Sequence, residues 1–147
     1  MTPRDEHAAV ERHLKVTRTA RYWTVGDPGQ GDGGEIWFVL HGYKQLARRF
    51  LRRFEALATD RRMLVAPEAL SRFYVSPEPG RHGPRSVVGA TWMTREDRLN
   101  EIEDYVAYLD GLAEELGAAR HRMTVLGFSQ GVATATRWVV RGAVRPG

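Results

Sequence analysis

Short apolar runs alternate along the chain with longer segments in which apolar residues return every three or four positions. The runs cover residues 35–40, 63–66 and 122–127, and a looser apolar–polar alternation covers 17–25. Uninterrupted runs of this length are typical of strands that are buried on both faces of a parallel sheet. We therefore predict a strand over each of these segments.

Helical periodicity appears between and after the runs. It predicts a helix over about residues 45–58, another over about 95–116 and a third over 129–141. Strands that alternate with helices form right-handed crossovers, which place the helices on both faces of a parallel sheet. The predicted fold class is therefore α/β, a three-layer αβα sandwich with a mostly parallel sheet.

Two segments show neither pattern. Residues 1–16 form a polar lead-in without an apolar block, so they do not resemble a secretory signal. Residues 67–94 are irregular and contain Pro77 and Pro79. Loops of this size in a compact domain usually carry function. We assign 67–94 to an active-site loop region within a single domain that spans residues 1–147.

Composition narrows the class of protein. The chain of 147 residues has no Cys, which excludes disulfides, thiolate zinc sites and cysteine nucleophiles. Its 22 Lys and Arg against 18 Asp and Glu give a net charge of +4. No stretch reaches the roughly 18 apolar residues of a membrane span. We expect a cytoplasmic protein without a metal, an organic cofactor or a nucleic-acid partner. Anion or nucleic-acid binding by arginines between Arg48 and Arg62 is an alternative to a solvated helix face.

The strongest candidate motif follows the last predicted strand. Gly127-Phe128-Ser129-Gln130-Gly131 is a G-x-S-x-G pentad that opens a predicted helix. This context is typical of a nucleophile elbow, in which a strained turn holds a serine oxygen above the sheet. Side chains at Gly127 or Gly131 would collide in so tight a turn. The pentad therefore predicts Ser129 as a nucleophile.

A second candidate segment, His41-Gly42-Tyr43, follows the run at 35–40. The oxyanion hole of an elbow enzyme takes one backbone N–H from the residue after the nucleophile and another from the loop after an earlier strand. These donors would be Gln130 and Tyr43, while Gly42 would let the substrate approach the backbone closely. We favour a buried structural role for His41 over a catalytic role, because the triad order places the base after the serine.

With Ala66-Pro67-Glu68, these motifs resemble the phospholipase/carboxylesterase family of α/β-hydrolases, which includes acyl-protein thioesterase-like serine esterases. The likeness covers about residues 17–142 and keeps the order of the motifs. It implies an α/β-hydrolase fold in which Ser129 is the nucleophile and the Tyr43 and Gln130 amides are the oxyanion donors.

The same resemblance implies a substrate pocket beside the nucleophile. Trp92 and Met93 lie where the family carries a loop next to the substrate, so we place them at the acyl or leaving-group pocket. Phe73 and Tyr74 are further candidates for its lining. Plain packing in the core is the alternative for all four side chains.

One part of the family pattern is missing from the chain. A hydrolase triad of this fold runs from Ser to Asp or Glu and then to His, yet no Asp, Glu or His follows Ser129. Without a base, a serine hydroxyl is a poor nucleophile near neutral pH. We therefore expect an incomplete domain, truncated after the helix at 129–141, inactive alone and prone to self-association through the strand at 122–127.

Two functions remain open. The first is a serine carboxylesterase, thioesterase or lysophospholipase that cleaves a small-molecule ester or thioester through an acyl-enzyme on Ser129. The alternative is a non-catalytic α/β-hydrolase relative that acts as a ligand-binding or interaction module. The absence of triad partners is the whole support for that alternative.

Overall fold

A four-stranded sheet forms the centre of the protein. The computed structural model describes residues 7–76 and 80–147; the lead-in residues 1–6, and Pro77 and Pro79 of the loop region, lie outside the described residues. Across the sheet the strand order is β1 (Tyr22–Val25), β3 (Arg62–Pro67), β2 (Glu35–Leu40) and β6 (Arg122–Gly127). β1 pairs with β3 in the antiparallel sense, whereas β2 pairs in parallel with β3 and β6. The mostly parallel sheet is confirmed.

The parallel strands coincide with the predicted apolar runs. Phe38 of β2 lies in register between Val65 of β3 and Val125 of β6. Because side chains alternate across a strand, the two faces of β2 feed separate clusters. Phe38 and Leu40 belong to one cluster, and Val39 belongs to the other. β2 is therefore buried on both faces.

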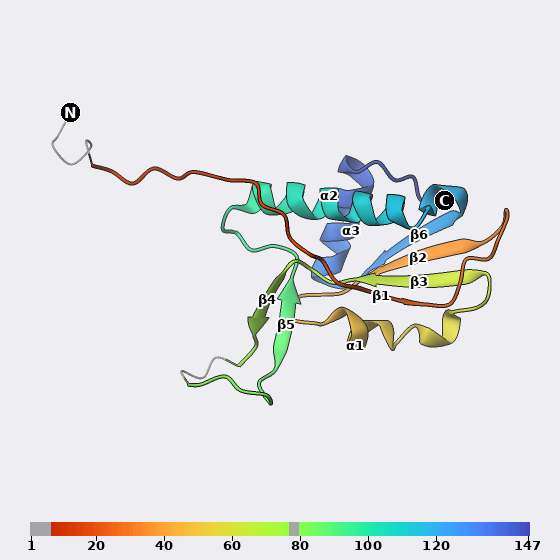
Figure 1. Ribbon diagram of the computed structural model, residues 1–147, viewed down its shortest axis with the longest axis horizontal. Helices are drawn as coiled ribbons and strands as arrows, with labels where there is room; N and C mark the ends of the chain where they lie inside the picture. The colour runs from red at the N-terminus through yellow and green to blue at the C-terminus, as the bar shows by residue number, and fades with distance from the viewer. Residues whose placement is uncertain (1–6, 77–79) are drawn as a thin grey trace.

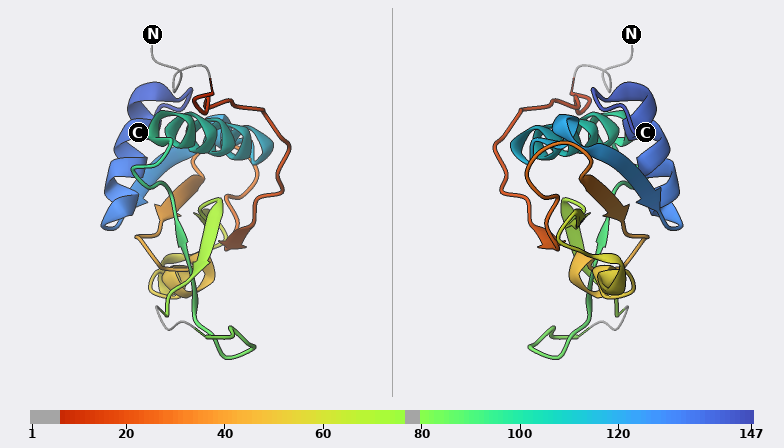
Figure 2. Two further views of the ribbon diagram at one scale, coloured as in Figure 1. Left: turned by 90° about the vertical axis from the view of Figure 1, so that its left-hand side faces the viewer. Right: turned by 90° about the vertical axis from the view of Figure 1, so that its right-hand side faces the viewer.

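Helices cover both faces of this sheet (Figures 1 and 2). The long helix α2 (Arg98–Glu115) and α3 (Gln130–Arg141) lie on one face, and the short α1 (Ala47–Leu51) lies on the other. Two 3-10 turns, η1 (Glu55–Leu57) and η2 (Ala118–Arg120), follow α1 and α2 along the chain. This arrangement confirms the three-layer αβα sandwich.

The prediction of a continuous helix over residues 45–58 is wrong. α1 ends at Leu51, after which the amides of Phe54 and Leu57 donate to carbonyls only three residues earlier, at 2.9 and 2.8 Å. The apolar stripe continues to Leu57, but that side chain is 42% exposed. Since helices in proteins are stabilised mainly by packing of an apolar face, the second half tightens into a 3-10 turn.

The region 67–94 is more regular than predicted. It contains β4 (Ser71–Tyr74) and β5 (Val88–Thr91), which form an antiparallel pair that projects from the body of the protein (Figure 1). The β-prone run in β4 is short, and the prolines that follow it obscured the pairing. The strand predicted over 17–25 is shorter than expected, since β1 begins only at Tyr22.

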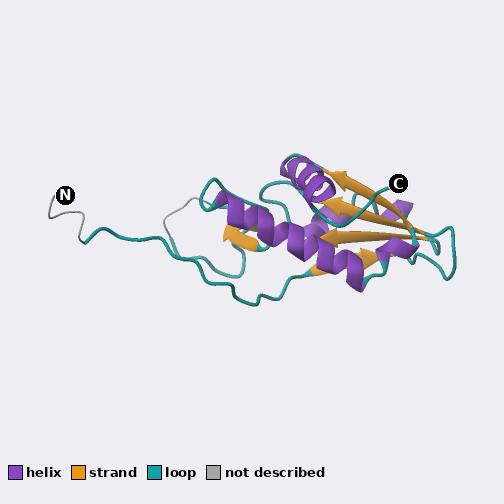
Figure 3. Ribbon diagram, turned by 90° about the horizontal axis from the view of Figure 1, so that it is seen from above, coloured by secondary structure: helices purple, strands orange, loops and turns teal. Residues whose placement is uncertain are grey.

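The described part of the lead-in is extended and runs along α2 (Figure 3). Lys15 lies 3.6 Å from Asp104 of α2, and the Tyr108 hydroxyl donates to the carbonyl of Arg21 at 3.3 Å. These contacts join the lead-in to the face of the protein that α2 covers. In residues 7–76 and 80–147, no helix is both long and apolar enough to cross a membrane.

A buried carboxylate holds three elements together near the site. Glu68 follows β3 and is almost fully buried. It accepts hydrogen bonds from Arg72 at 2.7 Å, from Arg21 at 2.7 Å and from the amide of Ala47 at 3.2 Å. Burial alone raises the pKa of Glu68, but these donors outweigh it, and the pKa lies below its ordinary value. Glu68 thus links the start of α1 to β4 and to the end of the lead-in.

Candidate active site

The pentad forms a sharp turn between β6 and α3. Ser129 has φ 56° and ψ −118°, a backbone conformation that L residues rarely adopt. A side chain at Gly127 would collide with the backbone of Gly131, four residues later. The turn therefore requires glycine at this position, and it leaves Ser129 exposed at the carboxyl end of β6.

The structure brings the elbow against the loop that follows β2. The amide of Phe128 donates to the carbonyl of Leu40 at 3.1 Å. A Cβ at Gly42 would lie 3.2 Å from the Cβ of Ser129, and a Cβ at Gly131 would collide with the Leu40 carbonyl. Gly131 therefore requires glycine and Gly42 leaves little room for a side chain, so the two predicted segments form one site.

Two backbone amides at this contact are free to bind a ligand oxygen. Gln130 is the first residue of α3, where an N–H has no partner within the helix. The amides of Gly131 and Val132 already donate to Phe128 and Ser129. In the part of the chain that the structure describes, neither Gln130 N nor Tyr43 N donates a hydrogen bond. The positive end of α3 adds to their attraction for an anion.

Glutamine side chains hold both halves of the site. Oε1 of Gln130 accepts from the amide of Trp92 at 2.9 Å, and Nε2 donates to Oγ1 of Thr91 and the carbonyl of Met93, each at 2.9 Å. Oε1 of Gln45 accepts from the amide of Gly42 at 2.6 Å. Sequence reasoning used only the backbone of Gln130 and missed Gln45, because no pattern distinguishes a polar residue that bonds a distant loop.

His41 is buried beneath the site. Its Nδ1 lies 2.8 Å from the carbonyl of Gly42, and its Nε2 accepts from the amide of Ala69 at 3.0 Å. These contacts describe a neutral ring with the proton on Nδ1. Burial lowers the pKa of His41, against smaller opposing effects of the Gly42 carbonyl and Glu68. With both nitrogens engaged, the ring supports the loop.

The four side chains predicted to line the substrate pocket differ in their position and burial. Phe73 stacks on Tyr43 with ring centroids 5.3 Å apart, so it lies beside the loop that follows β2. Tyr74 is exposed on β4 and stacks on a histidine in the loop after it. Trp92 is buried behind the site and donates from Nε1 to the carbonyl of His41 at 2.8 Å. The partly buried Met93 packs against the same core cluster as Trp92. The pocket roles remain predictions.

No base contacts Ser129 among the described residues. The Ser129 hydroxyl makes no hydrogen bond within residues 7–76 and 80–147. His41 uses both ring nitrogens elsewhere, His121 precedes β6 at the opposite end of that strand, and His13 lies 3.2 Å from Asp97. The described site thus consists of an exposed serine and two amides without hydrogen-bond partners, and no base contacts the serine.

Comparisons with known proteins identify the fold. No protein-family model matches the chain, and no curated protein matches its sequence. The solved structures that match it include acyl-protein thioesterase 2 of Zea mays, at TM-score 0.53 and 21% identity, and esterase PE8, at TM-score 0.52 and 22% identity. The alignments cover 80% and 84% of this chain. The chain has the α/β-hydrolase fold. It spans 49% of the first of those chains and 59% of the second.

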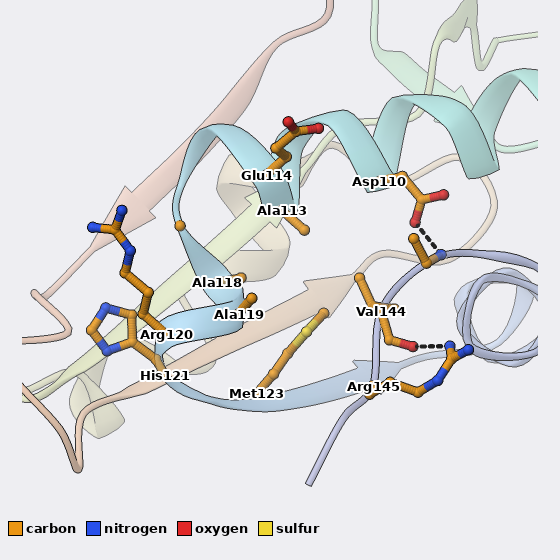
Figure 4. Close-up of a pocket in the computed structure, with 12 residues that line it drawn as sticks. Asp110, Ala113, Glu114, Ala118, Ala119, Arg120, His121, Met123, Val144 and Arg145 are labelled. Atoms are coloured by element: carbon orange, nitrogen blue, oxygen red, sulfur yellow. Dashed lines mark hydrogen bonds between the residues drawn. The ribbon is translucent and has the colours of Figure 1, made fainter.

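The protein also has a cavity of about 550 Å³ that lies away from the elbow (Figure 4). It lies between the end of α2, η2 and the segment 143–145, and Met123 at the start of β6 contributes to its wall. Ser129 follows the other end of β6, roughly 20 Å along a six-residue strand. The cavity is therefore separate from the candidate site.

One group of side chains has the composition of a metal site. Glu11, His13 and Asp97 bring ligand atoms within 4.8 Å of one another, and all three are exposed. The group lies where the lead-in meets the start of α2, far along the chain from the elbow. It contributes nothing to the site of this α/β-hydrolase fold.

Proposed function

We propose that this chain carries the nucleophile and the oxyanion hole of a serine hydrolase that cleaves carboxylic esters or thioesters. The observation that supports this most is the strained turn at Ser129, which presents the side chain next to the unbonded amides of Tyr43 and Gln130. Strained backbone in folded proteins concentrates at functional sites.

The reaction would begin with attack of the Ser129 hydroxyl oxygen on the carbonyl carbon. The carbonyl oxygen becomes an oxyanion and accepts hydrogen bonds from the two amides, each worth about 3 kcal/mol in the transition state. The alcohol or thiol then leaves with a proton, and water hydrolyses the acyl-enzyme. The step needs a base that takes the serine proton and an acid that orients it; no Asp, Glu or His follows Ser129 in this sequence, and no described base contacts the Ser129 hydroxyl.

The proposed substrates are small molecules, among them lysophospholipids, and the proposed location is the cytoplasm. The names of the two structural neighbours, a thioesterase and an esterase, support both classes of acyl bond. Since both neighbours are below 25% identical, the choice between ester and thioester depends on assays.

A serine-directed fluorophosphonate tests the proposal. It is applied to protein expressed from the uninterrupted reading frame that contains this chain, and the labelled peptide is identified by mass spectrometry. We expect label on Ser129, none in Ser129→Ala, and unchanged labelling in Ser86→Ala, a serine in the loop after β4. Equal labelling of the Ser129→Ala protein would reject Ser129 as the nucleophile.

The missing base favours a second candidate, a non-catalytic member of this fold that binds a ligand at the two amides. It predicts no fluorophosphonate labelling of any form of the protein. It also predicts no difference between wild type and Ser129→Ala in the hydrolysis of 4-nitrophenyl butyrate. These outcomes would replace the enzyme with a binding module.

A further inference from the structure

A small groove lies between α1 and β5, next to the candidate active site. Its volume is about 210 Å³, enough for a carboxylate or phosphate group with a few carbons. The buried ring of Phe50 and the half-buried Val88 form part of its wall. The remaining lining residues are Lys44, Gln45, Leu46, Arg49, Arg53 and Val87.

Three of these residues carry positive charge and none carries negative charge. Lys44, Arg49 and Arg53 are exposed, and none of them forms a salt bridge with a residue that the structure describes. Like charges gathered without a counter-ion repel one another, and an anion between them relieves that repulsion.

Three of the four other arginines of the basic stretch contact groups outside the groove, and the fourth, Arg52, is exposed and does not line the groove. Arg48 lies over the ring of Trp23 at 5.2 Å. Arg61 donates to the carbonyl of Asp32 at 2.9 Å, and Arg62 pairs with Glu35 at 2.7 Å. Positive charge therefore gathers in one groove and is not spread evenly along the stretch from Arg48 to Arg62. This distribution does not favour a nucleic-acid surface.

The groove adjoins both halves of the elbow site. Lys44 follows Tyr43, whose amide is a proposed oxyanion donor. The guanidinium of Arg53 lies 5.8 Å from the ring centroid of Phe128, the residue before Ser129. An ester carbonyl at Ser129 and an anionic group in the groove would therefore belong to one short molecule.

The backbone fixes Lys44 at the rim of the groove. Lys44 has φ 61°, in the left-handed region, and its amide donates to the carbonyl of Ala90 at 2.9 Å. A Cβ at Gly89 would lie 2.6 Å from the Cα of Lys44, so β5 presses directly on this residue. Such a conformation costs energy in a non-glycine residue and persists where its surroundings impose it.

We propose that the groove binds a carboxylate or phosphate group of the substrate, so that the ester cleaved at Ser129 is anionic. This inference rests on the proposed function in one respect, namely that the bound anion is part of a substrate. Binding of the anion itself does not need Ser129. The apolar wall formed by Phe50 and Val88 contacts the methylene groups between the anion and the ester.

Ligand-observed NMR tests the inference on the same protein that is used for fluorophosphonate labelling. The probes are monomethyl glutarate, which is an anionic ester, dimethyl glutarate, its neutral analogue, and butyl phosphate. We expect saturation transfer to the two anions and none to dimethyl glutarate. The anion that binds more tightly identifies the group that the groove selects. We also expect binding to weaken as salt rises, because the cations are exposed.

Matched variants locate the binding. Replacing two exposed cations in Arg49→Gln/Arg53→Gln should raise the dissociation constant about fivefold. Arg52→Gln removes a charge from the same segment outside the groove, and it should change the dissociation constant by less than twofold. Equal binding of neutral and anionic probes, or an equal effect of Arg52→Gln and Arg53→Gln, would overturn the inference.

Ser129→Ala separates this inference from the proposed function. It should abolish fluorophosphonate labelling and leave anion binding unchanged. If labelling persists in Ser129→Ala while the groove binds anions, the proposed function fails and the anion site stands. If labelling depends on Ser129 and no anion binds, the inference fails and the function stands.

Discussion

The two strands that carry the candidate site, β2 and β6, are alike in sequence pattern and unlike in surroundings. Each has six residues, they pair in parallel, and each ends in a glycine-containing turn. On β2, Phe38 and Val39 are fully buried. Their partners on β6, Val125 and Leu126, are only partly buried. The two halves of one site therefore have unequal support.

The difference follows from what flanks each strand. β2 lies between β3 and β6, whereas β6 is an edge strand among the described elements. The amides of Arg122 and Phe128 bond toward β2, so the polar groups of the residues alternating with them point outward. One of these, the carbonyl of Met123, accepts from the amide of Gly147 at 2.9 Å. Ser129, the proposed nucleophile, therefore lies on the less protected half of the site.

The largest expected effect comes from the contact that joins the halves. Gly131→Ala should destabilise the fold by about 3 kcal/mol, because its Cβ would strike the carbonyl of Leu40. Urea unfolding measures this. As a control, Gly111→Ala in α2 meets nothing within 4 Å and should stabilise the fold by about 0.5–1 kcal/mol. A neutral Gly131→Ala would show that the elbow is not tightly packed on β2.

The same deletion on each strand compares the two supports directly. Val39→Ala removes two buried methyl groups from β2 and should cost about 2 kcal/mol. Val125→Ala removes them from a partly buried position on β6 and should cost about 1 kcal/mol. Equal losses in urea unfolding would mean that β6 is as well covered in solution as β2.

Substitution of Gln130 and of Gln45 compares the hydrogen bonds that support the β6 half and the β2 half of the site. Gln130→Ala removes three hydrogen bonds to the 91–93 segment and leaves the Trp92 amide unpaired, so it should cost about 2 kcal/mol. Gln45→Ala leaves only the Gly42 amide unpaired and should cost about 1 kcal/mol. Amide hydrogen exchange should rise at Trp92 in the first variant and at Gly42 in the second. Exchange that stays slow at both amides would contradict the assigned bonds.

Acid should destabilise the β2 half in two steps. The pKa of His41 is lowered in the folded state, so unfolding takes up a proton and stability declines as pH falls below about 6.5. The pKa of Glu68 is also lowered, so a second decline begins below about 4.5. Melting temperatures between pH 8 and about 2.5 measure both steps. His41→Gln should remove the first decline and Glu68→Gln the second. A melting temperature that is constant over this range would contradict both assignments.

The change with the smallest expected effect on the free energy of unfolding is at the edge of β6, where we expect an effect on the measured molecular mass. The 147-residue chain should self-associate at micromolar concentration, because β6 presents outward polar groups and partly buried apolar side chains. Thr124→Lys places a charge on the edge strand and should shift the mass measured by light scattering toward the monomer. Thr17→Lys, in the exposed lead-in, should not. A monodisperse wild-type monomer with cooperative unfolding would contradict this expectation.

Local patterns determined much of this protein. The apolar runs of β2, β3 and β6 specify strands, because a short apolar segment reaches a low free energy when both its faces are covered. The pentad around Ser129 specified the strained turn, since only glycines at its ends permit such a close approach. Both features depend on residues that are adjacent in sequence.

Other features depend on residues far apart in the chain, and only the tertiary structure decided them. Beyond Leu51, Phe54 still packs against the core but Leu57 is exposed, a difference that periodicity cannot reveal. The bonds of Gln130 to the 91–93 segment link positions nearly forty residues apart. The three cations of the groove meet because β5 lies against Lys44 and Gln45, in the segment that leads into α1. Packing across the fold sets these arrangements, and it leaves no signature in any single stretch of sequence.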